Sequence, residues 1–243
     1  MGLKRLVGCN IVRLDVVDST NEKAKELLEE TVPEGTVVLA GRQASGRGRY
    51  GRAWASPPGG LYLSIILKPE ERNANLLSLL SGLPVARAIG TLGVAVRLKW
   101  PNDIVIGDKK VGGILCEGVY RHDTFFAIVG IGVNTANDIR RFPPDLAGVA
   151  TTLRKETGRQ LDNDSFLSDL IRLYDDFYRD YKHGRTGAML GEYRKLCTIL
   201  GTEVVVETAK GIVRGTASDI SAAGALVILR GDTRTEIFEG TVR

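Results

Sequence analysis

The 243-residue sequence contains few of the residues on which several enzyme classes depend. Its only histidines are His122 and His183, so hydrolysis through a histidine base is a poor first hypothesis. Its three cysteines, Cys9, Cys116 and Cys197, are too few and too widely spaced to predict a disulfide framework or a zinc site. This cysteine usage favours a reducing compartment, and we expect a cytoplasmic protein.

Long apolar runs are also missing. No segment approaches the ~18 apolar residues that a membrane span requires, and the N-terminus lacks the apolar stretch of a secretory signal. We therefore expect no membrane partner. Hydrophobic residues make up 43% and charged residues 26% of the chain, the balance of an ordinary globular protein. A net charge of +4 does not by itself require nucleic acid and suits an acidic substrate equally well.

Apolar periodicity predicts an α+β fold with a mixed, largely antiparallel sheet. We expect strands at 9–17, 36–40, 61–67, 94–100, 103–107, 110–120 and 124–134, and helices at 19–30, 75–92, 163–182 and 187–199. Pro84 must kink or divide the second helix. After Gly201 four short strands punctuated by glycines predict a small β-barrel. We therefore divide the chain into a catalytic domain at 1–199 and a barrel domain at 200–243.

The most unusual segment is GRGRYGR at residues 46–52, called the arginine loop below. Its glycines match a dinucleotide-binding pattern, but two prolines and a strand follow instead of a helix, so we reject that interpretation. Glycines let the backbone approach a ligand, and the guanidinium groups of Arg47, Arg49 and Arg52 match phosphate oxygens. The loop is a candidate polyphosphate clamp in which Tyr50 or Trp54 could stack on a base. A solvated basic loop or an RNA-binding segment has the same composition.

Four further segments combine a structural role with a candidate ligand contact. Ser19 to Glu22 fits a capping box, and a helix start also presents free N–H groups. KWPND at 99–103 is a strand end and turn that brings a lysine and an aspartate close to a tryptophan. Lys110 precedes two glycines in a hairpin and could reach a buried anion. In GIGVN at 130–134, glycines inside a strand indicate close approach of a backbone or a ligand, beside a possible amide contact.

Taken together, these segments resemble the biotin protein ligases. The matching set is DSTN (18–21), RQASGRGRYGRAW (42–54), KWPND (99–103), KVGGIL (110–115) and GIGVN (130–134), in this order. The resemblance implies a biotin/lipoate ligase-like catalytic domain followed by a small SH3-like barrel. It also implies ATP-dependent biotinylation, in which biotin and MgATP give biotinyl-5′-AMP and pyrophosphate. The acyl group then passes to a lysine of a biotin carboxyl carrier protein, such as that of acetyl-CoA carboxylase.

The resemblance also implies roles for individual residues. It assigns biotin binding to Ser19, Thr20, Asn21, Gln43, Gly113, Gly130 and Gly132. It assigns nucleotide binding to Arg47, Gly48, Arg49, Trp54, Asn102, Asp103, Lys110 and Asn134. Lys110, Arg49 and Arg47 are expected to be catalytic, because positive charge offsets the repulsion between two reacting anions. Mg²⁺ is expected to arrive with ATP, without a dedicated protein metal site.

Partners and alternatives complete the hypothesis. The carrier protein is the expected protein substrate, and a homodimer is left open because a sheet edge in such folds often pairs. The match begins at Asp18, so we expect no helix-turn-helix domain and no specific DNA binding. The nearest rival is a lipoate–protein ligase, although Thr20, Asn21 and Gln43 offer polar groups for the ureido ring of biotin. A biotin- or RNA-binding module without catalysis is the alternative from another class.

Overall fold

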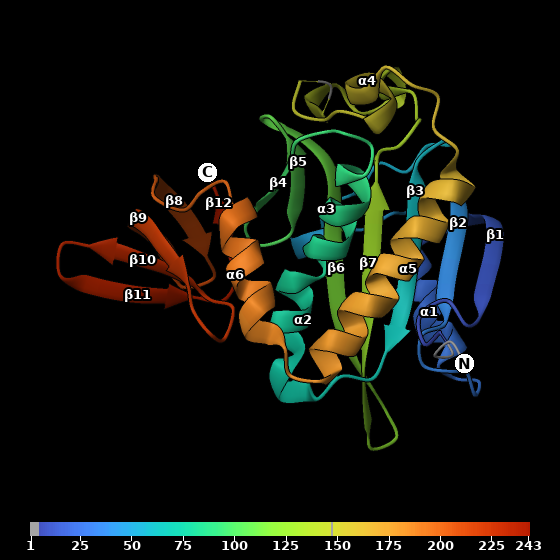
Figure 1. Ribbon diagram of the computed structural model, residues 1–243, viewed down its shortest axis with the longest axis horizontal. Helices are drawn as coiled ribbons and strands as arrows, with labels where there is room; N and C mark the ends of the chain where they lie inside the picture. Colours follow the sequence, from blue (N-terminus) through green and yellow to red (C-terminus); the bar gives the residue numbers. More distant parts are fainter. Residues whose placement is uncertain (1–4, 147) are drawn as a thin grey trace.

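The computed structural model describes residues 5–146 and 148–243 and contains a large sheet flanked by helices beside a smaller sheet (Figure 1). The strands are β1 (Ile11–Val17), β2 (Val37–Gln43), β3 (Leu61–Leu67), β4 (Val96–Lys99), β5 (Asp103–Ile106), β6 (Lys109–Arg121), β7 (Thr124–Val133), β8 (Glu203–Thr208), β9 (Gly211–Ile220), β10 (Leu226–Arg230), β11 (Thr233–Ile237) and β12 (Thr241–Val242). The helices are α1 (Thr20–Leu27), α2 (Ala74–Leu80), α3 (Gly82–Gly90), α4 (Leu153–Thr157), α5 (Asn163–Lys182) and α6 (Thr186–Leu196). No described helix is long and apolar enough to cross a membrane.

The large sheet has the strand order β1-β2-β3-β7-β6-β5-β4. β1 and β2 are parallel, and the other neighbouring pairs are antiparallel, which confirms a mixed, largely antiparallel sheet. β7 lies between β3 and β6, and its residues 126–131 are buried. The continuous apolar run of this strand is explained by its cover on both faces.

The two faces of the sheet carry different layers. α3 and α5 lie across one face, where they bury Leu63 and Ile65 of β3 (Figure 1). α1 covers the other face, where Ala24 packs in a separate apolar cluster with Ile66. Because successive strand residues point to opposite faces, one apolar strand serves both layers.

Local sequence explains where α5 begins and why the expected helix at 75–92 is divided. Asp162 is the N-cap of α5, and its carboxylate accepts the backbone N–H of Asp164, which satisfies one of the free donors of the first turn. The expected helix at 75–92 is divided at Ser81 into α2 and α3. Pro84 lies in the first turn of α3, where its missing N–H removes no helical hydrogen bond.

The predicted capping box is wrong. Ser19 is the N-cap residue of α1, but its side chain makes no capping hydrogen bond. Glu22 does not complete the box either, because its carboxylate pairs with the ammonium of Lys25 and the guanidinium of Arg47. The carboxylate binds these two cations in preference to the backbone N–H of Ser19, since hydrogen bonds between charged groups are the stronger ones. The Ser19 hydroxyl therefore stays available at the edge of the cavity described below.

The smaller sheet has the strand order β11-β10-β9-β8-β12, so five strands form where we expected four. The last predicted strand is interrupted after Ile237, and β12 pairs with β8 instead of extending β11. Gly240 allows this crossing, because a Cβ there would lie 2.6 Å from Cγ1 of Val206. β12 lies beside α6 (Figure 1), and the residues around it contact Arg49 and Arg52. The SH3-like topology and the division between 199 and 200 stay predictions.

Candidate active site

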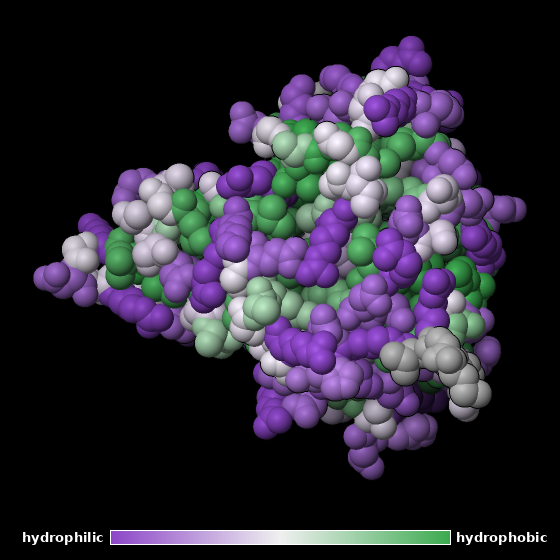
Figure 2. Space-filling model, viewed as in Figure 1, coloured by the Kyte–Doolittle hydropathy of each residue, from purple (hydrophilic) through white to green (hydrophobic). Residues whose placement is uncertain are grey.

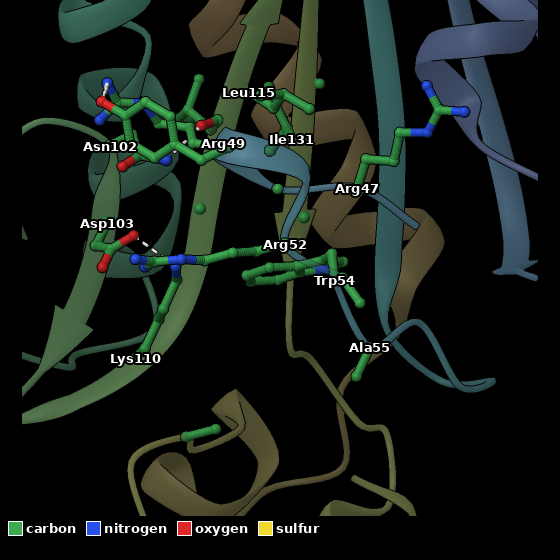
Figure 3. A pocket seen from close by; sticks show the side chains of 18 of the residues that line it. Arg47, Arg49, Arg52, Trp54, Ala55, Asn102, Asp103, Lys110, Leu115 and Ile131 are labelled. Carbon is green, nitrogen blue, oxygen red and sulfur yellow. Dashed lines mark hydrogen bonds and ion pairs between the residues drawn. The ribbon is translucent and has the colours of Figure 1, made fainter. Parts of the chain in front are cut away.

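One cavity of about 280 Å³ opens between the large sheet, the arginine loop and β12. Its walls come from the start of α1, the segment after β2, the turn between β4 and β5, and the ends of β6 and β7 that face this turn. All the residues to which the sequence assigned a ligand contact line this cavity, and Figure 3 labels six of them, Arg47, Arg49, Trp54, Asn102, Asp103 and Lys110. They are Ser19, Thr20, Asn21, Gln43, Arg47, Gly48, Arg49, Trp54, Asn102, Asp103, Lys110, Gly113, Gly130, Gly132 and Asn134.

Glycines form the part of the wall contributed by β6 and β7. A Cβ at Gly130 would lie 2.3 Å from Oδ1 of Asn21, and one at Gly132 would lie 2.6 Å from the indole of Trp54. The sequence predicted close approach at both glycines, and protein side chains provide it. The side chains of Asn21 and Trp54 therefore pack directly against the backbone of β7 at these two glycines.

The polar end of the cavity consists of Ser19, Thr20, Asn21 and Gln43, and Ser64 lies behind Thr20 and Asn21. Oε1 of Gln43 accepts the backbone N–H of Thr20 at 2.8 Å and its hydroxyl at 3.1 Å. Nε2 of Gln43 donates to Oγ of Ser56 at 2.8 Å. Nδ2 of Asn21 donates to the carbonyl of Leu115 and the carboxylate of Glu117. The amides are thus fixed by protein partners before any ligand arrives.

Ser64 was missed by the sequence analysis. Its side chain is fully buried, and its Oγ lies 2.5 Å from Oδ1 of Asn21 and 2.7 Å from Oγ1 of Thr20. With the Thr20–Gln43 contact there are three contacts between these groups, but Ser64 and Thr20 provide only two hydroxyl protons. One oxygen therefore lacks a proton donor, and an N–H group of a ligand would supply it. A hydroxyl inside the apolar run LYLSIIL was the signal that could have identified Ser64.

The arginine loop is a tight turn whose arginines separate. The backbone N–H of Gly48 donates to the carbonyl of Arg52, and Tyr50 adopts a φ of 56° in the left-handed region. Arg47 pairs with Glu22 on α1, and Figure 3 shows it pointing away from the other charged residues of the cavity. The guanidinium of Arg49 lies 4.9 Å from the centre of the Tyr50 ring. Without a ligand, the three arginines therefore do not converge on one point.

Lys110 is held in place through both its side chain and its backbone. Its Nζ lies 2.5 Å from Oδ1 of Asp103 and 5.2 Å from the centre of the Trp54 ring. Its backbone N–H donates to the carbonyl of Val149, and its carbonyl accepts the N–H of Thr151. The chain after β7 thus runs beside Lys110 and fixes the direction of its ammonium group, which lies at the cavity wall (Figure 3).

The two asparagines to which the sequence assigned a nucleotide contact also make hydrogen bonds within the protein. Nδ2 of Asn102 donates to the carbonyl of Ile114 at 2.8 Å, and the backbone N–H of Ile114 donates to the carbonyl of Asn102 at 2.9 Å. Oδ1 of Asn134 accepts from Nδ2 of Asn137 at 3.2 Å. Asn102 therefore keeps its Oδ1, and Asn134 its Nδ2, for contact with a ligand.

The smaller sheet also contributes to the cavity, which the sequence did not predict. Gly240, Thr241 and Val242 line it. The carbonyl of Gly240 accepts from Nη1 of Arg49, and Oγ1 of Thr241 accepts from Nη2 of Arg52, both at 3.3 Å. The segment after β7 adds apolar side chains at Phe142, Leu146 and Val149. These contacts join regions far apart in the sequence.

The cavity combines a buried polar end with a cationic end. Such a site can orient a small neutral ring through hydrogen bonds and bind phosphate groups near the ammonium and guanidinium groups. Among residues 5–146 and 148–243, no group of three or more His, Cys, Asp or Glu side chains could hold a metal ion.

Comparisons with known proteins agree with this geometry. The model of the biotin/lipoate A/B protein ligase family matches residues 14–134. The bifunctional ligase/repressor BirA of Bacillus spizizenii is 35% identical over 99% of this chain and 76% of its own length. The biotin–[acetyl-CoA-carboxylase] ligase of Paracoccus denitrificans is 31% identical over 91% of this chain and 94% of its own length.

A solved structure extends the similarity to the whole fold. The biotin protein ligase of Aquifex aeolicus, in complex with biotin and ATP, superposes with a TM-score of 0.85 at 34% identity. The superposition covers 97% of this chain and 99% of that protein, so it includes the smaller sheet. The chain belongs to the biotin/lipoate A/B protein ligase family and, within that family, to the biotin protein ligases.

Proposed function

We propose that the chain uses MgATP to attach biotin to one lysine of a biotin carboxyl carrier protein, such as that of acetyl-CoA carboxylase. The observation that carries this proposal is the cavity itself, in which a fixed polar end and a cationic end share one continuous wall. The relatives named as biotin ligases and the Aquifex complex with biotin and ATP support the same pair of small substrates.

In the proposed first step, a carboxylate oxygen of biotin attacks the α-phosphorus of ATP. The bond from that phosphorus to the bridging oxygen breaks, and pyrophosphate leaves with Mg²⁺. Both reactants are anionic, so a cation between them lowers the barrier. Lys110 is suited to this role because the contact with Asp103 and the backbone contacts to residues 149–151 fix its ammonium group at the cavity wall. Arg49 and Arg47 add charge when the arginine loop closes.

The proposed second step uses no nucleophile of the enzyme. The neutral ε-amine of the carrier lysine attacks the acyl carbon of biotinyl-5′-AMP and forms the amide bond. The bond from that carbon to the phosphate oxygen breaks, AMP leaves, and the proton lost by the amine passes to solvent. The adenylate must be protected from water in the meantime, which is a role for the arginine loop and β12. The ring of biotin would lie at the polar end, against Gly130 and Gly113, and the nucleotide beside Trp54, Asn102 and Asn134.

The test is pyrophosphate release from MgATP with biotin or lipoate supplied separately, followed by transfer to a carrier domain. We expect release with biotin and formation of an amide on one carrier lysine. Release with lipoate alone would move the protein to the sister branch of the family. Release with neither would favour a binding module and contradict the proposal.

The remaining expectations stay predictions. A cytoplasmic location and a homodimer rest on the sequence arguments above. The absence of specific DNA binding can be tested by a gel shift with biotin and ATP present, in which specific retardation would contradict it.

A further inference from the structure

Four charged side chains of alternating sign form a line from the arginine loop to the polar end of the cavity. Nη1 of Arg47 lies 2.8 Å from Oε1 of Glu22, which lies 2.9 Å from Nζ of Lys25. The same ammonium group lies 2.7 Å from Oε1 of Glu117. Oε2 of Glu117 then accepts from Nδ2 of Asn21 at 2.6 Å. This set, called the charge line below, connects a loop side chain to an amide that lines the cavity.

The inner members of the charge line do not belong to the cavity wall. Glu22, Lys25 and Glu117 are absent from the cavity lining, so they cannot act by touching a substrate there. Their side chains are about one third exposed or less, at 33%, 27% and 28%. Partial burial weakens screening by water and salt, and each charge in the middle of the line touches two partners.

The titration behaviour of the two α1 residues agrees with mutual stabilisation. A hydrogen bond from Lys25 holds the pKa of Glu22 below its ordinary value, in spite of partial burial. Burial alone would lower the pKa of Lys25, but hydrogen bonds to Glu117 and Glu22 raise it above the ordinary value. Both groups therefore stay charged at neutral pH.

We propose that Glu22, Lys25 and Glu117 are positioning residues, which hold Arg47 and the arginine loop beside the polar end and couple the loop to the orientation of Asn21. The part of this inference that concerns biotin rests on the proposed function. The part that concerns the loop does not, because the ion pair between Arg47 and Glu22 is present without any ligand.

The geometry of α1 explains why Glu22 and Lys25 can serve both ends. They are three residues apart and lie on one side of the helix, where Lys25 faces Glu117 of β6. Lys23 and Glu26 form a second pair of the same spacing on this helix, with Nζ and Oε2 2.9 Å apart. That pair contacts neither the loop nor Glu117, so it provides a matched control within the same helix.

The size of the effect follows from the exposure of Arg47. An isolated exposed ion pair shifts an equilibrium by up to roughly fivefold, and a pair anchored in a network shifts it more. The side chain of Arg47 is 53% exposed, whereas its partner Glu22 is held by Lys25. Loss of the Glu22 charge should therefore raise, by about three- to tenfold, the fraction of molecules in which the arginine loop is detached from α1.

Limited digestion with trypsin measures this fraction directly, because the loop offers cleavage sites after Arg49 and Arg52. The ligand-free full-length protein is compared with the variants Glu22→Gln, Lys25→Met and Glu26→Gln. We expect cleavage in the loop to be about three- to tenfold faster for Glu22→Gln and Lys25→Met, and unchanged for Glu26→Gln. Sodium chloride screens the ion pairs, so it should raise the rate of cleavage of the wild-type loop towards that of Glu22→Gln. Equal rates for Glu22→Gln and wild type, or equal acceleration by Glu26→Gln, would overturn the proposal, and unchanged thermal midpoints exclude global unfolding as the cause.

A kinetic measurement tests the other end of the line. Glu117→Gln keeps a hydrogen-bond acceptor for Asn21 but loses the charge that faces Lys25. We expect KM for biotin to rise severalfold while kcat stays within about twofold. A fall in kcat with unchanged KM would overturn the coupling to Asn21. If the wild type itself does not turn over biotin, the proposed function fails, yet the digestion result still decides whether the charge line holds the loop.

Discussion

The two ends of the cavity are built in contrasting ways. At the polar end, Ser19, Thr20, Asn21 and Ser64 are at most 4% exposed, and the amides of Asn21 and Gln43 are held by protein partners. The charged end, formed by Arg49, Arg52, Asp103 and Lys110, is partly exposed and borders β12, whose sheet is separate from the one that carries the polar end. Figure 2 shows many hydrophilic side chains on the face that it presents, and the polar groups of the cavity differ from these because they are buried.

This contrast indicates a division of labour. Recognition of a small ring requires donors and acceptors that do not move, and buried amides with satisfied hydrogen bonds provide them. Entry of a nucleotide and departure of pyrophosphate require groups that can exchange partners, and the long, partly exposed contacts of Arg49 and Arg52 can do so at little cost. Substitutions at the polar end should therefore change folding stability and biotin affinity together, and substitutions at the charged end should change the rate or the affinity for ATP.

The largest effect is expected for Lys110→Ala. Loss of one preorganised cation should lower the rate of pyrophosphate release by ~10²–10³, roughly 3–4 kcal/mol, because the cation acts when charge builds up between the reactants. Lys109→Ala is the matched control, since Lys109 lies in the same hairpin but does not line the cavity. Biotin affinity, measured by calorimetry, should change much less than the rate. An equal loss of biotin affinity would contradict the proposed division between the two ends.

Gly130→Ala tests how rigid the polar end is. The new Cβ would lie 2.3 Å from Oδ1 of Asn21, and Asn21 cannot retreat because Leu115 and Glu117 hold its Nδ2. Overpacking of this kind should lower the free energy of unfolding by about 1–3 kcal/mol and raise KM for biotin more than KM for ATP. The control is Gly191→Ala on α6, where a Cβ meets no atom within 4 Å. Urea unfolding measures the free energy of unfolding of both variants. Equal values would show that Asn21 and its neighbours can move to accommodate the new Cβ.

Ser64→Ala should have a smaller effect at the same end. It removes a buried hydroxyl and leaves Oδ1 of Asn21 without its donor, which should cost roughly 1–2 kcal/mol of folding stability. KM for biotin should rise and KM for ATP should stay unchanged. The exposed helical serine of Ser168→Ala is the control. A selective rise in KM for ATP would mean that Ser64 acts on the other end of the cavity.

The sequence predicted those parts of the molecule that depend on local patterns. The strand from 61 to 67 and the helix from 163 to 182 have the predicted bounds, because a continuous apolar run and a helical apolar pattern are both recognised within a few residues. The motif glycines also predicted close approach correctly, since Gly130 and Gly132 have no other reason to interrupt a buried strand. The convergence of the motif residues on one cavity came from the family resemblance and not from periodicity.

Most failures of prediction involve contacts between distant segments. Glu22 was expected in a capping box, but Arg47, which lies 25 residues later in the chain, competes for its carboxylate. The contact of β12 with the arginine loop spans about 190 residues and leaves no local signature in FEGTVR. Phe142, Leu146 and Val149, which form the apolar wall of the cavity, lie in a segment whose sequence has no periodic pattern. Tertiary contacts decide such positions, and propensity alone carries no information about them.

The smallest effect is expected where the two sheets meet, with Thr241→Val. This change keeps the shape of the side chain and removes the oxygen that accepts from Nη2 of Arg52 at 3.3 Å. The contact is exposed and not ideal in length, so its loss should raise KM for ATP by no more than about fivefold, and KM for biotin should not change. Thr233→Val, an exposed strand threonine in the same sheet, is the control. A rise in KM for biotin as large as that for ATP would show that β12 acts on the polar end, because a contact made through Arg52 alone should affect the charged end.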